Sequence, residues 1–171
     1  MEYSFRNASL DDLPQIWAIL EKAILRRKED GSNQWQDGYP NPAVIQKDIE
    51  RNAGFVMMDG SAAIGYVAIL VNDEPAYEEI DGKWVTNGDF VVFHRVAVSE
   101  DYLGRGLSRE MLTFIEEFAL KNGLHSIKAD TNFDNAAMIS IFKKAGYVYC
   151  GEVFFRGSPR LAYEKVLDTH L

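Results

Sequence analysis

An apolar segment, a glycine-containing turn and a helical repeat follow one another between residues 90 and 118. This order constrains the fold more than any other part of the chain. Residues 90–98 are the most apolar run and predict a buried, central strand. After the turn, apolar residues recur at helical spacing up to Phe118. Such a turn presents backbone N–H groups and the positive end of a helix dipole to an anion.

The turn itself reads Leu103-Gly104-Arg105-Gly106-Leu107-Ser108. It is not a P-loop, because no Gly-Lys-Ser/Thr sequence follows the glycines. It also fits a Rossmann turn poorly, because that turn closes the first strand–helix unit of its domain, whereas this one lies past the midpoint of the chain. The turn therefore matches neither of these two nucleotide-binding motifs.

The length of 171 residues predicts one domain spanning residues 1–171, since domains commonly run to ~100–200 residues. A hydrophobic content of 47% is enough for a sizeable core. The net charge of −8 argues against nucleic acid or an anionic membrane surface as a partner. It is compatible with a cationic substrate, but net charge bears on solubility more than on function.

Cys150 is the single cysteine, so no internal disulfide can form, and a reducing compartment fits. The first residues lack the basic and apolar regions of a signal peptide. No apolar run approaches the ~20 residues of a membrane span. We therefore expect a soluble, cytoplasmic protein that uses neither a membrane nor nucleic acid. No cluster of metal-ligating residues is expected.

The order of expected elements is βααβββαβαββ, which predicts an α/β fold with a mixed central sheet and flanking helices. A helix begins at Pro42 with Asn41 as its cap, and Gly123 ends the helix that follows the turn. Residues 72–88 are polar and are interpreted as an excursion or loop. The expected strands cover residues 4–6, 54–58, 63–71, 90–98, 125–129, 147–155 and 160–166.

The turn, together with Val96-Ala97-Val98 before it, resembles the acetyl-CoA pyrophosphate motif of the GNAT N-acetyltransferases. That motif is written Gln/Arg-x-x-Gly-x-Gly/Ala, and Leu103 and Ser108 depart from it. The departures leave the main-chain amides of the cradle intact. A second segment, from Asn135 to Tyr147, is similar to the family's Asn-x-x-Ala-x-x-Leu/Phe-Tyr-x-x-x-Gly-Phe pattern, with the same spacing between asparagine and glycine.

The resemblance implies the GNAT fold and acetyl-CoA as the donor of an acetyl group. It also implies that pantetheine runs along the strand and bonds to its backbone, beside a splayed partner strand. Arg105 is equally well interpreted as a surface charge, and Asn135 as a helix cap. The expected cofactor-binding residues are Val96, Ala97, Val98, Leu103, Gly104, Arg105, Gly106, Leu107, Ser108, Asn132 and Asn135.

His94 is the candidate general base, because imidazole exchanges protons near neutral pH and strand alternation puts it on one face with Val96 and Val98. The alternative is a hydrogen-bonded structural histidine. The family often places a tyrosine, as general acid, where this chain has Phe142. Either the thiolate leaves unassisted, or Tyr147 or Tyr149 serves; the alternative for both tyrosines is a core aromatic.

The acceptor is expected to be the primary amine of a small molecule or peptide. Acids at Asp37, Glu78, Glu79 or Asp81 could attract it, or could be solvated charges. The expected substrate-binding aromatics, which could equally be packed loop residues, are Trp35, Tyr39, Tyr77 and Trp84.

Other functions fit the same residues. One is O-acetyl transfer or the use of a longer acyl-CoA. Another is a non-catalytic acyl-CoA-binding or sensing module, which the phenylalanine in place of an acid favours. A third is an unrelated nucleotide-binding domain. A homodimer is also open, because many relatives of this fold are dimers.

Overall fold

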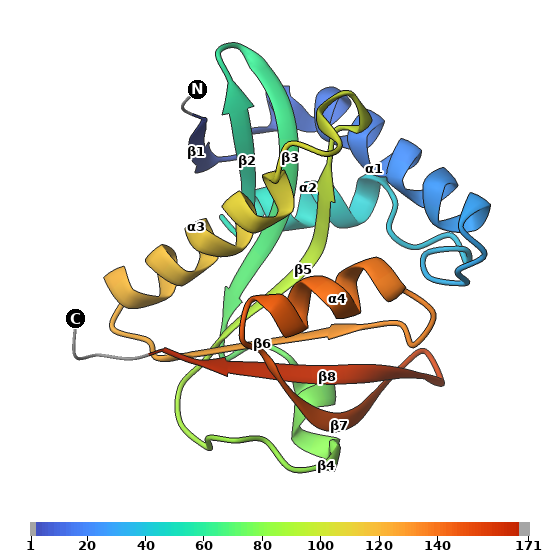
Figure 1. Cartoon of the computed structure of the whole chain (residues 1–171). Helices are drawn as coiled ribbons and strands as arrows, with labels where there is room; N and C mark the ends of the chain where they lie inside the picture. The colour runs from blue at the N-terminus through green and yellow to red at the C-terminus, as the bar shows by residue number, and fades with distance from the viewer. Residues whose placement is uncertain (1–2, 168–171) are drawn as a thin grey trace. The chain divides into compact units, whose positions relative to one another are not determined.

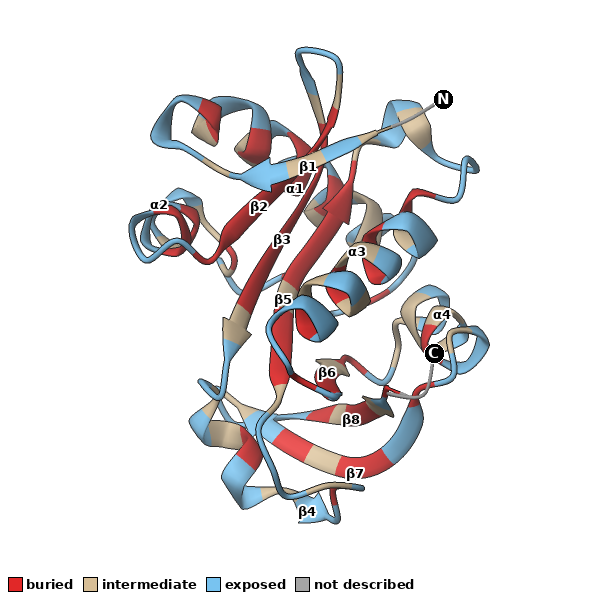
Figure 2. Ribbon diagram, turned by 90° about the vertical axis from the view of Figure 1, so that its left-hand side faces the viewer, coloured by how far each residue is buried: buried red, intermediate tan, exposed pale blue. Residues whose placement is uncertain are grey.

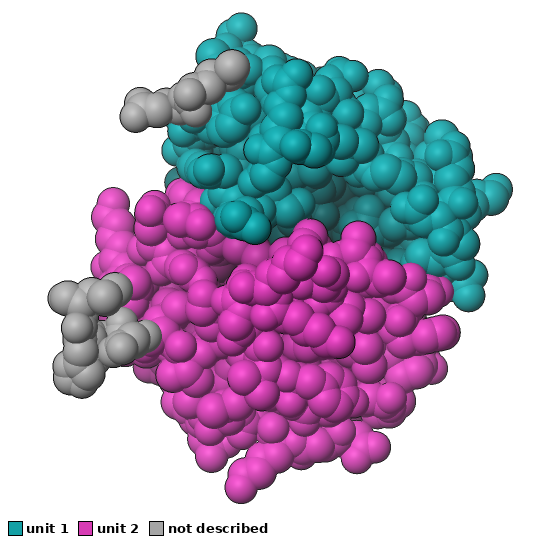
Figure 3. Space-filling model, viewed as in Figure 1, with its two compact units in different colours: residues 1–69, 95–111 teal, residues 70–94, 112–171 magenta. Residues whose placement is uncertain are grey.

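The computed structural model describes residues 3–167, and these form two compact units that Figure 3 shows in different colours. Among the described residues, unit 1 comprises 3–69 and 95–111, and unit 2 comprises 70–94 and 112–167. The central strand β5 (Val91–Val98) contributes its first half to unit 2 and its second half to unit 1. The prediction of a single domain over residues 1–171 stays a prediction.

Unit 1 has the strand order β1-β2-β3-β5 (Figure 1). β1 (Ser4–Asn7), β2 (Gly54–Asp59) and β3 (Ala62–Val71) pair antiparallel. Figure 2 shows β2 and most of β3 as buried. The helical elements are η1 (Leu10–Asp12), α1 (Leu13–Glu29), α2 (Pro42–Glu50), η3 (Glu100–Tyr102) and the first turn of α3 (Leu107–Lys121).

The helices of unit 1 form where the sequence predicts them. α1 buries one stripe, which includes Ile16 and Leu20 at 0% exposure, as an amphipathic helix does against a sheet. α2 begins as expected. The Asn41 side chain accepts a hydrogen bond from the Val44 N–H at 3.0 Å, and Pro42, at the first helical position, has no N–H that would be left unpaired. In the core of this unit, buried side chains of α1 and α2 pack with side chains of β2 and β3.

Unit 2 has the strand order β5-β6-β8-β7-β4. β6 pairs with β8, β8 with β7, and β7 with β4, all antiparallel. β5 pairs with β6 in parallel at Val91 and Val92 only, among the described residues of this unit. The elements are β4 (Asp81–Gly82), β6 (Ser126–Thr131), β7 (Val148–Phe155), β8 (Ser158–Val166), η2 (Pro75–Glu79), α4 (Ala136–Lys144) and the remainder of α3.

The expected α/β class with a mixed sheet is confirmed, and the described residues form eight strands, mostly antiparallel. The 72–88 segment differs from the loop prediction because it contains η2 and β4. β4 reaches β7 through two glycines: a Cβ on Gly82 would lie 2.2 Å from the Cys150 carbonyl oxygen, and Gly151 is equally crowded. Only glycine permits this backbone approach.

The last hairpin is tighter than predicted. β8 begins at Ser158, and the turn consists of Arg156 and Gly157, with φ values of 49° and 76°. Two successive residues with positive φ make the two-residue turn that matches the twist of paired strands. Gly123 has a φ of 71° after α3, as predicted. No helix in residues 3–167 is long and apolar enough to cross a membrane.

Candidate active site

The glycine turn of unit 1 has an open backbone. Gly104 and Gly106 have φ values of 79° and 75°, and a Cβ added to either meets no atom within 4 Å. Leu103 is half exposed, whereas Leu107 is buried and anchors the first turn of α3. The backbone of the turn is therefore accessible at the start of a 15-residue helix, where N–H groups and the helix dipole favour an anion.

Arg105 and Ser108 belong to this turn but differ in their surroundings. The Arg105 guanidinium lies 4.8 Å from the centre of the Tyr102 ring, and that tyrosine donates a hydrogen bond to Asp59 at 2.5 Å. Arg105 is exposed and Ser108 is half-buried. Both of the roles open for Arg105, phosphate contact and surface charge, fit this position.

The second half of β5 is buried, and Val96, Ala97 and Val98 are at most 9% exposed. Immediately before them Arg95 has a φ of 59°, a left-handed conformation that is rare for a side-chain-bearing residue inside a strand. The alternation argument that put His94 on one face with Val96 and Val98 was wrong to assume a regular strand, because this residue interrupts it.

Arg95 is held by a buried polar network in unit 1. Its guanidinium donates to both oxygens of Asp48, at 2.8 and 2.6 Å, and to the Tyr39 hydroxyl at 2.5 Å. Asp48 is 0% exposed and also accepts from Tyr66 at 2.7 Å. Burial lowers the pKa of Arg95, but Tyr39 and Asp48 outweigh that effect and raise it. The hydrogen bond from Arg95 holds the half-buried Tyr39 side chain in place through its hydroxyl.

Trp35, the other aromatic predicted for the acceptor site in this unit, is 5% exposed. The Arg27 guanidinium lies 3.8 Å from the centre of its ring. Burial, aided by Arg26, lowers the pKa of Arg27 to about 10. The indole therefore packs as a covered loop aromatic. Asp37, from the same loop, is exposed.

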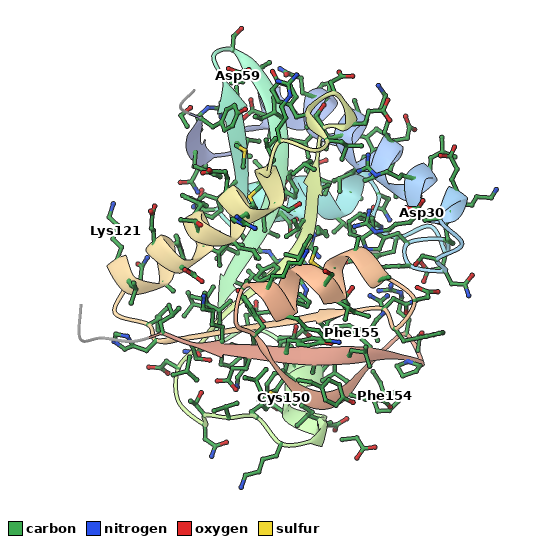
Figure 4. All side chains as sticks on the ribbon, in the orientation of Figure 1. Asp30, Asp59, Lys121, Cys150, Phe154 and Phe155 are labelled. Atoms are coloured by element: carbon green, nitrogen blue, oxygen red, sulfur yellow. The ribbon has the colours of Figure 1, made fainter. Side chains whose placement is uncertain are left out.

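In unit 2, His94 is enclosed by carboxylates and rings. Its Nε2 lies 2.7 Å from Glu74 Oε2, an ion-pair distance without the alignment of a hydrogen bond. Its Nδ1 lies 4.0 Å from Asp130 Oδ2. The ring centre is 6.4 Å from that of Tyr77 and 6.2 Å from that of Phe155, a β7 residue labelled in Figure 4.

Tyr77 and Trp84 lie together in unit 2. Tyr77 donates to Asp130 at 2.6 Å, and burial together with Asp130 raises its pKa. The Trp84 indole N–H donates to the Tyr77 carbonyl at 2.9 Å. Glu78, Glu79 and Asp81 are exposed. A cavity of about 480 Å³ adjoins these residues, and its lining includes Glu74, Tyr77, Glu78, Trp84, Phe90 and Lys128.

The residues of the second motif also lie in unit 2. The Asn135 side chain accepts from Met138 N–H at 3.1 Å and caps α4, which is the alternative role considered for it. Asn132 is 4% exposed and donates to Asp134 at 2.5 Å. These two asparagines flank the start of α4.

Phe142 is 1% exposed and stacks between Tyr147 and Tyr163. The Tyr147 hydroxyl is buried without a hydrogen-bond partner, and burial raises its pKa. Tyr149 is 54% exposed. Cys150 is buried, and burial raises its thiol pKa, so it lacks the features of a nucleophile. The described residues contain no group of side chains able to hold a metal ion.

A sequence profile described as the Acetyltransferase (GNAT) family matches residues 17–147, which include the strand, the turn and the second motif. The chain belongs to the GNAT acetyltransferase family. An L-methionine sulfoximine/L-methionine sulfone acetyltransferase of Pseudomonas paraeruginosa is 31% identical over 159 residues, which cover 90% of this chain and 84% of that protein.

Solved structures of GNAT proteins have the same fold. A GNAT-family acetyltransferase from Streptococcus agalactiae superposes with a TM-score of 0.88 at 33% identity, covering 98% of this chain and 96% of that one. The yncA protein of Salmonella typhimurium, solved with its cofactor acetyl-CoA, has a TM-score of 0.69 at 18% identity. It covers 100% of this chain and 97% of its own.

Three charged groups of the structure were not predicted from the sequence: Glu74, Lys128 and the Arg95–Asp48 pair. Glu74 and Lys128 come from a polar segment and a buried strand, without a spacing that connects them to His94. The Arg95–Asp48 pair joins residues 47 positions apart. The only local signals were Arg95 among the apolar residues of β5 and Lys128 between Ile127 and Ala129 in β6.

Proposed function

We propose that this GNAT protein transfers an acetyl group from acetyl-CoA to the primary amine of a small molecule. The observation that carries the proposal is the His94–Glu74 pair, at 2.7 Å, beside a cavity lined by acids and aromatics. An imidazole backed by a carboxylate is a chemically suitable acceptor for the proton of an attacking amine. The family membership supplies the acetyl-transfer chemistry.

The proposed donor site fits the open turn. Residues 103–108 would bind the pyrophosphate through main-chain amides, since Gly104 and Gly106 are exposed and a Cβ added to either would meet no atom within 4 Å. Val96, Ala97 and Val98 would bond to pantetheine through their backbone. The short pairing between β5 and β6, which covers Val91 and Val92, agrees with the expected splayed strand. The acetyl-CoA in the Salmonella protein further supports this donor.

In the proposed reaction, the lone pair of a neutral amine attacks the thioester carbonyl carbon, forming the C–N bond. The C–S bond breaks, and its electron pair leaves with sulfur as the CoA thiolate. The proton lost by the amine passes to His94, which lies 2.7 Å from Glu74. Thiols have a pKa of about 8.5, so the thiolate leaves readily without a tyrosine at the position of Phe142.

A small-molecule acceptor is supported by the name of the Pseudomonas relative, which acetylates L-methionine sulfoximine and sulfone. It is also supported by the cavity, since about 480 Å³ lies in the usual range of small-molecule pockets. Tyr77 and Trp84, two of the aromatics expected to bind the acceptor, contribute to the wall of this cavity. Glu78 lines the same cavity. Its carboxylate would attract the acceptor amine while that amine still carries its extra proton and a positive charge.

The experiment is a pH–rate profile of amine-dependent CoA release in His94→Ala. At neutral pH we expect kcat to fall by about 10²-fold, the usual loss for a general base, with partial rescue at high pH. His125→Ala is the matched control, because His125 is an exposed histidine of the same unit. An unchanged profile in His94→Ala would remove this residue from the mechanism.

A second candidate is a module that binds acyl-CoA without turning it over. The observation in its favour is Phe142, a buried residue without a proton to donate, where family members often carry tyrosine. Tight acetyl-CoA binding with no acceleration of CoA release by any amine would support this function. Acceleration by an alcohol, or by amines only with longer acyl-CoAs, would instead support the third candidate, O-acetyl or longer-acyl transfer.

A further inference from the structure

Lys128 is a buried lysine of β6 that the proposed reaction does not use. Its side chain is enclosed by aromatic rings, with Nζ 4.5 Å from the centre of Trp84 and 4.3 Å from that of Phe90. The residue is 4% exposed and lines the cavity of unit 2. Among the described residues its ammonium has no hydrogen bond or ion pair.

The carboxylate nearest in register does not satisfy this ammonium. Glu164 lies opposite Lys128 in the antiparallel β6–β8 pair and is 0% exposed. Its oxygens accept from the Val85 N–H at 2.8 Å, from the Ser126 hydroxyl at 2.7 Å, and from the Thr86 hydroxyl. Glu164 therefore offsets the charge of Lys128 from a distance, while the N–H donors of Lys128 remain for the cavity.

A buried ammonium without an acceptor is unusual, because charged groups are seldom buried unless they are paired. The faces of the two aromatic rings compensate only partly for the missing acceptor. Burial accordingly lowers the pKa of Lys128, and Glu164 opposes that shift. A ligand oxygen that carries negative charge would complete the coordination of this group.

The wall of the same cavity also carries carboxylates. Glu74, which pairs with His94, and Glu78 both line it, as do the apolar faces of Trp84 and Phe90. One buried cation and several acids in a single cavity match a ligand that carries both charges. A molecule of amino-acid size fits a volume of about 480 Å³.

We propose that this cavity binds the acceptor as an α-amino-acid-like zwitterion, with the ligand carboxylate on Lys128 and the ligand amine on the side of Glu74. This inference rests on the proposed function, because it identifies the class of amine that the site takes. Lys128 is then a specificity-determining residue. It selects amines that carry a carboxylate, since an amine without one leaves the buried ammonium unpaired.

The test compares two substrates in the unaltered protein: L-methionine sulfone and its decarboxylated counterpart, 3-(methylsulfonyl)propan-1-amine. We expect kcat/KM to be about 10- to 100-fold higher for the amino acid, mostly through KM, as for loss of a charge-assisted hydrogen bond. Lys128→Met, which keeps the length of the side chain, should reduce this ratio to near one. Lys121→Met is the control, an exposed lysine at the end of α3 that Figure 4 labels.

The readouts separate this inference from the proposed function. Equal kcat/KM for the two substrates, or an unchanged ratio in Lys128→Met, overturns the role of Lys128 and leaves acetylation standing. If no amine is acetylated, the carboxylate site is tested by calorimetric Kd values for L-methionine sulfone in the unaltered protein and in the two lysine variants. A Kd weakened about 10-fold or more in Lys128→Met but not in Lys121→Met supports the carboxylate site, and equal or absent binding overturns it. The comparison in the unaltered protein does not depend on how well a variant folds.

Discussion

Arg95→Met removes the main partner of a fully buried carboxylate, and its effect on stability can be worked out from the structure. Asp48 is 0% exposed and is held by Arg95 through two hydrogen bonds of 2.6 and 2.8 Å. Breaking one side of a buried pair costs about 3–5 kcal/mol, because the other charge stays uncompensated. Tyr66 still donates to Asp48, so the low end of that range, about 3 kcal/mol, is expected.

Thermal and urea unfolding followed by circular dichroism measure this loss. For a chain of 171 residues, each kcal/mol shifts Tm by about 2–4 °C, so Arg95→Met should lower Tm by about 6–12 °C. Arg51→Met is the control, because Arg51 bonds to the same carboxylate at 3.1 Å but is 35% exposed. In this variant Arg95 still compensates Asp48, and the partly exposed Arg51 is solvated before it is removed, so the loss of stability should be clearly smaller than in Arg95→Met.

A double variant tests the reasoning further. In Arg95→Met combined with Asp48→Asn, no charge is left stranded, so the loss should be smaller than the sum of the single losses by at least about 1 kcal/mol. A loss below about 1 kcal/mol for Arg95→Met alone, or full additivity in the double variant, would refute the buried-pair argument. Since Arg95 also holds Tyr39, the single variant should loosen the 31–40 loop as well.

Three further predictions concern the donor turn, acid stability and the buried tyrosine. Gly106→Ala should raise KM for acetyl-CoA, because the φ of 75° at Gly106 strains any side chain by about 1–2 kcal/mol. Gly123→Ala is the control: it carries the same strain at a φ of 71° but should leave KM for acetyl-CoA unchanged. Equal effects of the two variants on KM would contradict a role for the turn. The hydrogen bond from Arg6 lowers the pKa of Asp12 from its ordinary 3.8 to about 2. Because that pKa is lowered on folding, its stabilisation, about 1–2 kcal/mol, is present above pH 3.8 and lost as pH falls through 2; urea titrations of Asp12→Asn should lack that pH dependence, and a parallel curve would disprove it. Tyr147→Phe removes a buried, unpaired hydroxyl, so unfolding should show equal or higher stability and kcat should be unchanged; a large fall in kcat would indicate an acid role.

The sequence predicted the fold through features that act locally. The apolar run of β5, the Asn41 cap and the glycine that ends α3 each depend on neighbours a few residues away, and each was confirmed. The bulge-like conformation at Arg95 was missed because it depends on a carboxylate from α2 that compensates a buried guanidinium. Strand alternation assumes a regular backbone, and here tertiary contacts overrode it.

The candidate site was predictable only in part, for the same reason. The donor turn is contiguous in sequence, so its residues were found together. The proposed acceptor site draws Glu74, His94 and Lys128 from a loop and two strands. No spacing joins them, and a lone acid or lysine in sequence is most often a solvated charge. Only folding brings Glu74 and Lys128 to one cavity and places His94 beside Glu74.

Amine-dependent acetyl transfer is tested by following CoA release from acetyl-CoA with a panel of primary amines. The panel includes L-methionine sulfone, and mass spectrometry of the product completes the assay. We expect release to accelerate with at least one small amine and one N-acetyl product to form for each CoA released. Tight binding of acetyl-CoA without acceleration by any amine in the panel would contradict it.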